Sequence, residues 1–268
     1  MSNLITSLQN PLIKSVVRLQ QKASERRTTG CFAIEGRREI SLARQNNIEV
    51  EKLFFCPEIF KPDPIYPVMF DDIDTSKLFE VSMAVYNKIA YREGVEGVIM
   101  IGRAPEARLS AYKPGKNSLM VVLEGVEKPG NLGAILRTTD AAGVDAILLC
   151  NMRTDLFNPN AIRASLGCIF SQKIFVCEST EAINWLKEKG IDLLAAAPET
   201  PHLYTDVNFT KPTAIAFGAE DEGLSQLWLK QARQVVKIPM NGVIDSLNVS
   251  AAVAIIAFEA IRQRALYL

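Results

Sequence analysis

The stretch that decides the fold is "LMVVLEGVEKPGNLGAILRTTDAAGVDAILLCN", residues 119–151. It begins with an apolar run, passes through a loop containing Pro129 and Gly130 into a helical pattern, and ends with a second apolar run. This order predicts a strand, a helix that ends at Gly143, and a second strand parallel to the first. Strands that are apolar almost throughout are typical of a parallel sheet with helices on both faces.

The same alternation continues toward the C-terminus. A long, nearly uncharged helical pattern follows the loop "IPMNGVIDSLNVS" at 238–250. Further strands are predicted over 173–178, 192–198, 213–220 and 235–240, and further helices over 159–167 and 180–190. We therefore expect an α/β domain built on a parallel sheet.

The N-terminal part predicts a smaller α/β domain. Asn10 and Pro11 indicate the start of a helix, because Pro is favoured at the first helical position. The runs at 50–56 and 97–102 predict strands, and Ser82 is expected to cap a second helix. A polar segment containing proline and glycine follows. The predicted domains are 1–103 and 118–268, joined by a linker at 104–117.

Composition limits the class of protein. The chain has 268 residues, 48% hydrophobic and 22% charged, which is typical of a soluble globular protein. No apolar run reaches the roughly 18 residues that a membrane span needs, and the first residues lack the order of a signal peptide. We expect a cytoplasmic protein without a membrane segment. The five cysteines are scattered and form no CxxC pair, so no metal site is predicted.

Charge is balanced overall but uneven along the chain. The sequence has 30 basic and 30 acidic residues, whereas residues 1–50 hold eight basic and four acidic ones. Such an excess is compatible with an ordinary solvated face or with a surface that attracts RNA phosphates.

Three loops at predicted strand ends are rich in Gly, Asn and polar side chains. The first follows a strand that ends at Val126, the second a strand that ends at Gly218, and the third is the stretch 238–250. Ligands of parallel sheets bind at the carboxyl ends of strands, so we expect the three loops to face one crevice. Each loop also has a structural interpretation as a tight turn or a helix cap. The sequence has neither a GxGxxG nor a Walker pattern, and one histidine, His202, in a proline-flanked loop. The residues present suit group transfer by positioning.

The three loops resemble motifs of a known family. "VEKPGNLGAILRTTDAAG", "AFGAEDEGLS" and "IPMNGVIDSLNVSAAVAIIAFEA" look like motifs 1, 2 and 3 of the SpoU (TrmH-like) RNA ribose 2′-O-methyltransferases of the SPOUT superfamily. "ITSLQNPLIKSVVRLQQKASERRTTGCFAIEG" and "YREGVEGVI" are similar to the substrate-binding domain of its ribosomal-RNA branch. The resemblance implies S-adenosylmethionine as cofactor, a deep trefoil knot in the C-terminal domain, and a homodimer whose sites borrow residues from the partner.

The resemblance also implies roles for individual residues. Those matching the catalytic positions are Asn131, Arg137, Glu220, Ser246 and Asn248. Those expected at the cofactor are Ala196, Gly218, Ile238, Met240 and Leu247, with Ala196 chosen by topology. The basic residues expected to bind RNA are Lys14, Arg18, Arg26, Arg27, Arg37 and Arg92.

The predicted function is 2′-O-methylation of a ribose in structured RNA, with ribosomal RNA favoured because the extra domain suits a large folded target. An alternative is an RNA-binding or ribosome-assembly factor of the same fold without turnover. A nucleotide-dependent oxidoreductase is disfavoured because the sequence lacks the GxGxxG pattern of dinucleotide-binding proteins.

Overall fold

The chain forms two compact units. The computed structural model describes residues 3–67, 70, 72–91 and 96–265. The first unit contains the chain up to Glu106 together with Asp155–Ser171, and the second contains Ala107–Thr154 and the chain from Gln172 onward. Residues 155–171, which the sequence assigns to the C-terminal domain, therefore pack with the N-terminal unit.

The first unit is built on a mixed five-stranded sheet in the order β1-β4-β3-β5-β2. β5 runs antiparallel to both β3 and β2, while β1 and β3 run parallel to β4. The strands are β1 (Asn3–Ile5), β2 (Cys31–Glu35), β3 (Val50–Phe55), β4 (Leu78–Val81) and β5 (Val98–Arg103). The helices are α1 (Pro11–Gln21), α2 (Ala23–Thr29), α3 (Arg37–Gln45), α4 (Met83–Ile89), α6 (Pro159–Ala164), α7 (Cys168–Ser171) and the 3₁₀ turn η1 (Thr75–Lys77).

Two predicted caps in this unit are confirmed. The Asn10 side chain accepts a hydrogen bond from the Leu12 N–H at 2.8 Å, and Pro11 is the first residue of α1. The Ser82 hydroxyl accepts from the Val85 N–H at 3.4 Å at the start of α4. Both contacts satisfy backbone donors that a helix leaves free at its first turn.

The second unit confirms the predicted parallel sheet. Its six strands lie in the order β11-β9-β10-β6-β7-β8, and every neighbouring pair is parallel. The strands are β6 (Leu119–Glu124), β7 (Ala146–Cys150), β8 (Ile174–Cys177), β9 (Asp192–Ala196), β10 (Thr213–Phe217) and β11 (Gln234–Val236). The helices are α5 (Pro129–Ala141), α8 (Ser179–Glu188), α9 (Gln226–Gln231), α10 (Val249–Ala265) and the 3₁₀ turns η2 (Leu109–Ala111) and η3 (Tyr204–Asp206).

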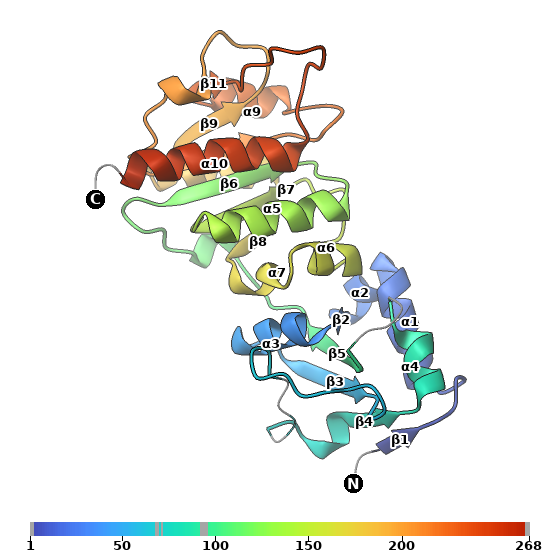
Figure 1. Cartoon of the computed structure of the whole chain (residues 1–268). Helices are drawn as coiled ribbons and strands as arrows, with labels where there is room; N and C mark the ends of the chain where they lie inside the picture. The colour runs from blue at the N-terminus through green and yellow to red at the C-terminus, as the bar shows by residue number, and fades with distance from the viewer. Residues whose placement is uncertain (1–2, 68–69, 71, 92–95, 266–268) are drawn as a thin grey trace. The chain divides into compact units, whose positions relative to one another are not determined.

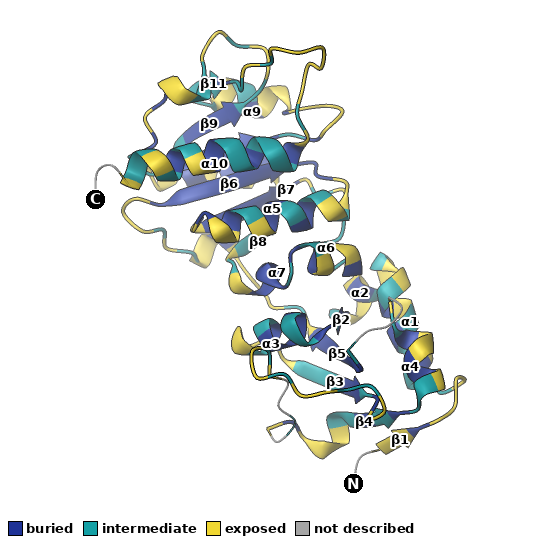
Figure 2. Ribbon diagram, in the orientation of Figure 1, coloured by how far each residue is buried: buried dark blue, intermediate teal, exposed yellow. Residues whose placement is uncertain are grey.

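Helices cover both faces of this sheet (Figure 1). On one face, Trp185 of α8 and Trp228 of α9 join a buried cluster with Met120 and Val122 of β6. Across the other face, α5 and α10 lie side by side and pack together. β6, β7 and β10 are buried along their whole length (Figure 2), which explains their continuous apolar sequence.

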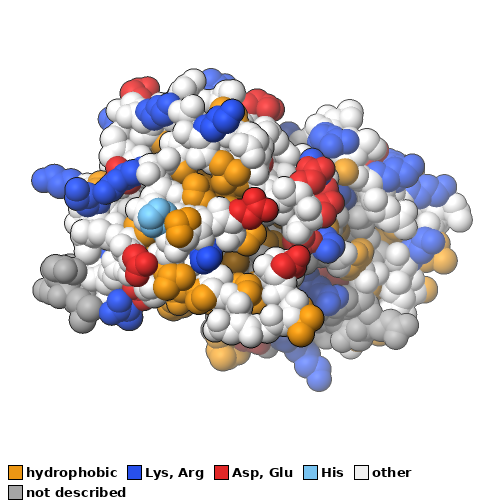
Figure 3. All heavy atoms as spheres, turned by 90° about the horizontal axis from the view of Figure 1, so that it is seen from above, with side chains coloured by type: hydrophobic (Ala, Val, Ile, Leu, Met, Phe, Trp, Pro, Cys, Tyr) orange, Lys and Arg blue, Asp and Glu red, His pale blue; other side chains and the backbone are white. Residues whose placement is uncertain are grey.

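The second unit also exposes large hydrophobic side chains. They include Leu227, Val243, Ile244 and Phe258, and Figure 3 shows hydrophobic side chains gathered on one face beside charged ones. Within the described residues, none of the helices combines the length and the apolar character that crossing a membrane requires.

Candidate functional site

Four adjacent strands end at one edge of the second sheet. Val236 of β11 lies opposite Ala196 of β9, and Phe217 of β10 lies opposite Leu123 of β6. Because β9 and β10 are also paired in register, the loops that follow these strands leave from the same edge. The expectation that the three motif segments share an edge is therefore confirmed. We call them the motif 1 segment (125–131), the motif 2 segment (218–225) and the motif 3 segment (237–248).

The motif 1 and motif 3 segments meet through two asparagines. Asn248 Nδ2 donates to Asn131 Oδ1 over 3.4 Å. Asn248 Oδ1 accepts from the N–H of Ser250 at 2.9 Å and from its hydroxyl at 2.6 Å. Asn248 is thus the helix cap of α10, which leaves its amide nitrogen to face Asn131. Asn131 Nδ2 is buried and has no hydrogen-bond partner within the described chain.

The motif 1 and motif 2 segments meet through ion pairs. Lys128 Nζ lies 2.7 Å from Glu220 Oε2, and this hydrogen bond raises the pKa of Lys128 above its ordinary value. Arg153, in the connection after β7, pairs with Glu127 at 2.7 Å and also with Glu222. The motif 1 segment is therefore held against both other segments.

The motif 2 segment is a tight turn that only glycine permits at its start. A Cβ on Gly218 would lie 2.0 Å from the carbonyl carbon of Gly223 and 2.2 Å from the backbone nitrogen of Leu224. Gly223 has φ +67°, and its N–H donates to the Ala219 carbonyl at 2.9 Å. Gly218 thus has a structural role that brings Glu220 back toward the sheet edge.

Two predicted catalytic residues stand apart from this cluster. Ser246 is exposed, and its hydroxyl donates to Asp245 over 3.3 Å. Arg137 is exposed on α5 and makes no ion pair with the described part of the chain. Six residues of helix separate it from Asn131, about 9 Å along the axis. The structure brings Asn131 together with Asn248, and Lys128 with Glu220, but it leaves Arg137 free on the surface.

The predicted cofactor residues share one kind of environment. All five are partly exposed; Ala196, Gly218, Ile238 and Met240 lie at or just beyond the carboxyl ends of β9, β10 and β11, and Leu247 lies in the motif 3 segment shortly before α10. Their side chains and the backbone groups of the loops offer apolar contact and hydrogen bonds at the same edge. This donor set fits S-adenosylmethionine, and the unpartnered amide of Asn131 is a polar group that such a ligand would satisfy.

One residue with a central position was missed by sequence reasoning. Glu124, the last residue of β6, is buried, and one of its carboxylate oxygens accepts from the Ser225 N–H at 2.8 Å. The other accepts from the hydroxyls of Ser225 at 2.9 Å and Ser179 at 3.0 Å. Ser179 also accepts from the Trp228 indole at 3.0 Å. An acid that ends an otherwise apolar strand was the available signal.

The predicted RNA-binding residues of the first unit have different surroundings. Lys14, Arg18 and Arg27 are exposed. Arg37 is partly buried, and its side chain donates to the Lys61 carbonyl at 2.7 Å. Arg92 lies outside the described residues.

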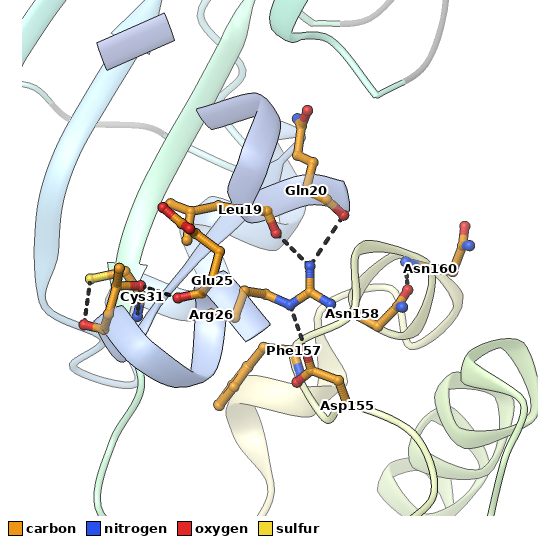
Figure 4. Close-up of polar contacts among 10 residues, drawn as sticks. Leu19, Gln20, Glu25, Arg26, Cys31, Asp155, Phe157, Asn158 and Asn160 are labelled. Carbon is orange, nitrogen blue, oxygen red and sulfur yellow. Dashed lines mark hydrogen bonds and ion pairs between the residues drawn. The ribbon is translucent and has the colours of Figure 1, made fainter. Parts of the chain in front are cut away.

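Arg26 requires a correction. Its side chain is buried and donates to the carbonyls of Leu19 and Gln20 and to Asp155 (Figure 4). The neighbouring Phe157 stacks on Phe32 with ring centroids 4.1 Å apart. Arg26 therefore anchors the segment 155–171 and has no free face for RNA.

No metal centre is visible within the described ranges, where no three His, Cys, Asp or Glu side chains are placed to share an ion.

Comparisons with family models match both units. Residues 118–258 match the SpoU rRNA Methylase family, and residues 10–100 match the MRM3-like substrate binding domain. The first match contains all ten residues predicted at the catalytic and cofactor positions.

Individual proteins agree with these matches. An uncharacterized tRNA/rRNA methyltransferase of Synechocystis, slr1673, is 30% identical over 97% of this chain and 94% of its own length. The 23S rRNA (guanosine-2′-O-)-methyltransferase RlmB of Photobacterium profundum is 37% identical over 56% of this chain and 61% of its own length. The structure of an AdoMet-bound rRNA methyltransferase from Sinorhizobium meliloti aligns with a TM-score of 0.88 at 29% identity, covering 97% of this chain and 98% of that one.

Proposed function

The chain belongs to the SpoU rRNA methylase family, and on that premise we propose that it is an enzyme that methylates the 2′-hydroxyl of a ribose in ribosomal RNA. S-adenosylmethionine supplies the methyl group, bonded to a sulfonium sulfur. The observation that carries the proposal is the meeting of three motif segments at one sheet edge, through Asn131 and Asn248 and through Lys128 and Glu220.

The chain's own residues position the reaction. Gly218, Ile238 and Leu247 would hold the cofactor through their backbone groups, with Met240 and Ala196 beside them. Ser246 and Asn248 orient the incoming ribose, and Asn131 holds the Asn248 side chain by accepting a hydrogen bond from its amide. Holding two reactants in line converts an encounter into an intramolecular step, which contributes as much as about 7–11 kcal/mol to lowering a barrier.

Arg137 binds the phosphate beside the target ribose. Its guanidinium is exposed and has no ion-pair partner among the described residues, and a guanidinium holds its proton too tightly to act as a base. The 2′-hydroxyl proton therefore passes to the Glu220 carboxylate, directly or relayed through the Ser246 hydroxyl, as the bond to the methyl carbon forms. Lys128 holds Glu220 near this point.

We further propose a homodimer with a knotted C-terminal domain. α10 carries three partly exposed apolar residues that are spaced one or two turns apart, namely Ala251, Ile255 and Phe258. A helix that is apolar on every side needs a second partner, and another copy of the same face would supply it. Such a dimer brings α5, which packs against α10, close to the partner's site.

The N-terminal domain is proposed to bind the RNA substrate, and the protein is proposed to act in the cytoplasm. In this division the RNA-binding domain is 1–103, the linker is 104–117 and the methyltransferase domain is 118–268. Support for RNA binding comes from the match of the N-terminal domain to a substrate-binding domain and from its exposed Lys14, Arg18 and Arg27.

The deciding experiment is transfer of radiolabelled methyl from S-adenosylmethionine to total RNA that lacks the modification, followed by nuclease mapping of the labelled ribose. Label in one fragment of ribosomal RNA, lost with Asn131→Ala, is the expected result. Cofactor binding without label on any RNA would instead favour an RNA-binding or ribosome-assembly factor of the same fold.

A further inference from the structure

A groove in the first unit lies between α1 and α4, outside the motif segments. It encloses about 310 Å³ and is lined by residues of the β1–α1 connection, α1 and α4. The two helices pack together, and the Gln20 side chain on α1 donates to the Ile89 carbonyl at the end of α4 over 2.6 Å. The two walls are therefore fixed relative to one another, so the groove is a built feature of the unit.

Three cations and no acid line the groove. Lys14 and Arg18 lie four residues apart on α1 and so share one face, and Lys88 faces them from α4. Lys14 and Lys88 are exposed and have no ion-pair partner within the described residues, while Arg18 pairs with Glu25 at 3.1 Å. In a chain whose formal net charge is zero, this is a local positive site.

Apolar side chains also line the groove. Leu8 is 43% exposed and Val17 of α1 is partly exposed, and we call these two residues the apolar floor. Gln9 adds an amide that both donates and accepts hydrogen bonds. Cationic and apolar side chains that line one groove match the two parts of a nucleotide, a charged phosphate and a flat base with its sugar. The volume is near the lower limit of the range for small-ligand pockets, which suits a single nucleotide.

We propose that this groove binds an unpaired segment of the RNA substrate, with phosphates on Lys14, Arg18 and Lys88 and one nucleoside over Leu8 and Val17. The proposal rests on the proposed function and adds the place and the kind of RNA it engages. Unpaired RNA is favoured over a duplex because only a splayed nucleotide presents its base to an apolar floor.

A second cavity in the same unit has different chemistry. It encloses about 430 Å³, but Glu49, Asp72 and Asp74 line it together with Arg44 and Lys77. Arg44 pairs with Asp72, and Lys77 lies 3.8 Å from Glu49, so its cations are neutralised internally. Because acidic residues line the second cavity but not the α1–α4 groove, the groove is the better binding site for the phosphates of RNA.

The test uses the full chain and two labelled RNAs of equal length, a hairpin with an unpaired loop and a blunt duplex. Lys14→Ala/Lys88→Ala is compared with Lys113→Ala/Lys116→Ala, which removes two exposed lysines from the second unit. The groove variant should bind the hairpin about tenfold more weakly. Its dependence of log affinity on log salt should be shallower by about 1.4, as expected for two lost contacts to single-stranded phosphates. The control pair should leave the affinity for the hairpin within about twofold of wild type and the slope of log affinity against log salt unchanged.

A third variant separates the base contact from the charge. Leu8→Ala should weaken hairpin binding severalfold without changing the salt dependence, because it removes no phosphate contact. Unchanged thermal unfolding and unchanged S-adenosylmethionine binding exclude loss of folding as the cause.

Equal affinity and salt slope for the groove and control variants would overturn the groove while leaving the proposed function intact, provided wild type still methylates ribosomal RNA. An equal loss on hairpin and duplex would overturn the assignment to unpaired RNA. A wild-type protein that binds neither RNA would overturn the groove and count against the proposed function as well.

Discussion

At the scale of single residues, Arg137 differs from the other proposed catalytic side chains in having no partner among the described residues. If it holds a phosphate through the two-pronged geometry of guanidinium, a lysine cannot replace it. Arg137→Lys should lower kcat by about 100-fold because the ribose loses its alignment. S-adenosylmethionine binding should be unchanged.

The control is Arg163→Lys, a change of the same kind at an exposed position on α6. Methylation should proceed at the wild-type rate in this variant. Retention of most of the rate by Arg137→Lys would rule out a specific guanidinium role and leave only a requirement for positive charge.

Gly218 offers a test of the motif 2 turn. The Cβ of Gly218→Ala would meet backbone atoms of Gly223 and Leu224, which cannot move aside as a flexible side chain does. The turn must open, so S-adenosylmethionine affinity measured by titration calorimetry should fall about tenfold or more. Gly130→Ala is the matched control, since nothing lies within 4 Å of its Cβ. Equal affinities in the two variants would show that the turn does not shape the cofactor site.

Glu124 should stabilise the motif 2 turn through its hydrogen bonds to Ser225. Glu124→Ala would leave the Ser225 N–H and two hydroxyls without an acceptor in a buried place, and should reduce the free energy of unfolding by about 3–5 kcal/mol. Glu124→Gln keeps an acceptor for the Ser225 N–H and should cost about 1 kcal/mol. Urea unfolding followed by the fluorescence of Trp228, which joins this network, measures both. Equal losses of unfolding free energy in the two variants would show that the hydrogen bonds accepted by the Glu124 side chain do not contribute to stability.

At the scale of helices and strands, the sequence predicted the second unit well because its signals are local. β6, β7 and β10 are buried on both faces, so their apolar runs are unbroken, and Pro129 and Gly143 mark the ends of α5. The short β2 and α3 escaped prediction because five residues such as "CFAIE" fit a strand or a buried helix equally. The loop positions could be inferred, whereas the contact of Asn131 with Asn248, 117 residues apart, needed the structure.

The C-terminal turns of α10 carry a pH-dependent contact. Glu259 accepts from Arg262 at 2.8 Å and from Gln263 at 2.8 Å, and Gln263 in turn holds the backbone of Val207 and Phe209. The hydrogen bonds from Arg262 lower the pKa of Glu259 below its ordinary value. A carboxyl whose folded-state pKa is lowered stabilises the fold above its unfolded pKa, and this contribution is lost as pH falls through the folded value.

Glu259→Gln should therefore cost more stability at about pH 6 than at about pH 3, because the stabilisation by the ionised wild-type carboxylate is lost as pH falls from the unfolded-state pKa through the lowered folded-state pKa. Urea unfolding of both proteins at each pH measures the difference. Glu188→Gln, at an exposed position of α8, is the control, and its cost should depend less on pH. A cost of Glu259→Gln that is equal at both pH values would show that the ion pair adds nothing.

At the scale of the whole molecule, the local pattern of apolar residues could not predict which segments belong to which unit. The sequence predicts an ordinary crossover helix over 159–167 between β7 and β8, and α6 forms within that range. The segment 155–171 that contains it, however, has partners more than 120 residues earlier, where Arg26 pairs with Asp155 and Phe32 stacks on Phe157. Nothing in the spacing of apolar residues identifies a partner that far along the chain.

The proposed dimer makes a prediction that no single chain can satisfy. If each site takes Arg137 from the partner, the homodimers of Arg137→Ala and of Asn131→Ala are both inactive, but a mixed dimer contains one intact site. Co-expression with two different tags and tandem purification would isolate the mixed dimer, whose methylation rate should be about half that of wild type. A mixed dimer as inactive as its parents would place Arg137 and Asn131 in the same subunit's site.

Phe258→Glu should convert the protein to monomers in gel filtration and abolish methylation, because the exposed face of α10 would then carry a charge where the partner packs.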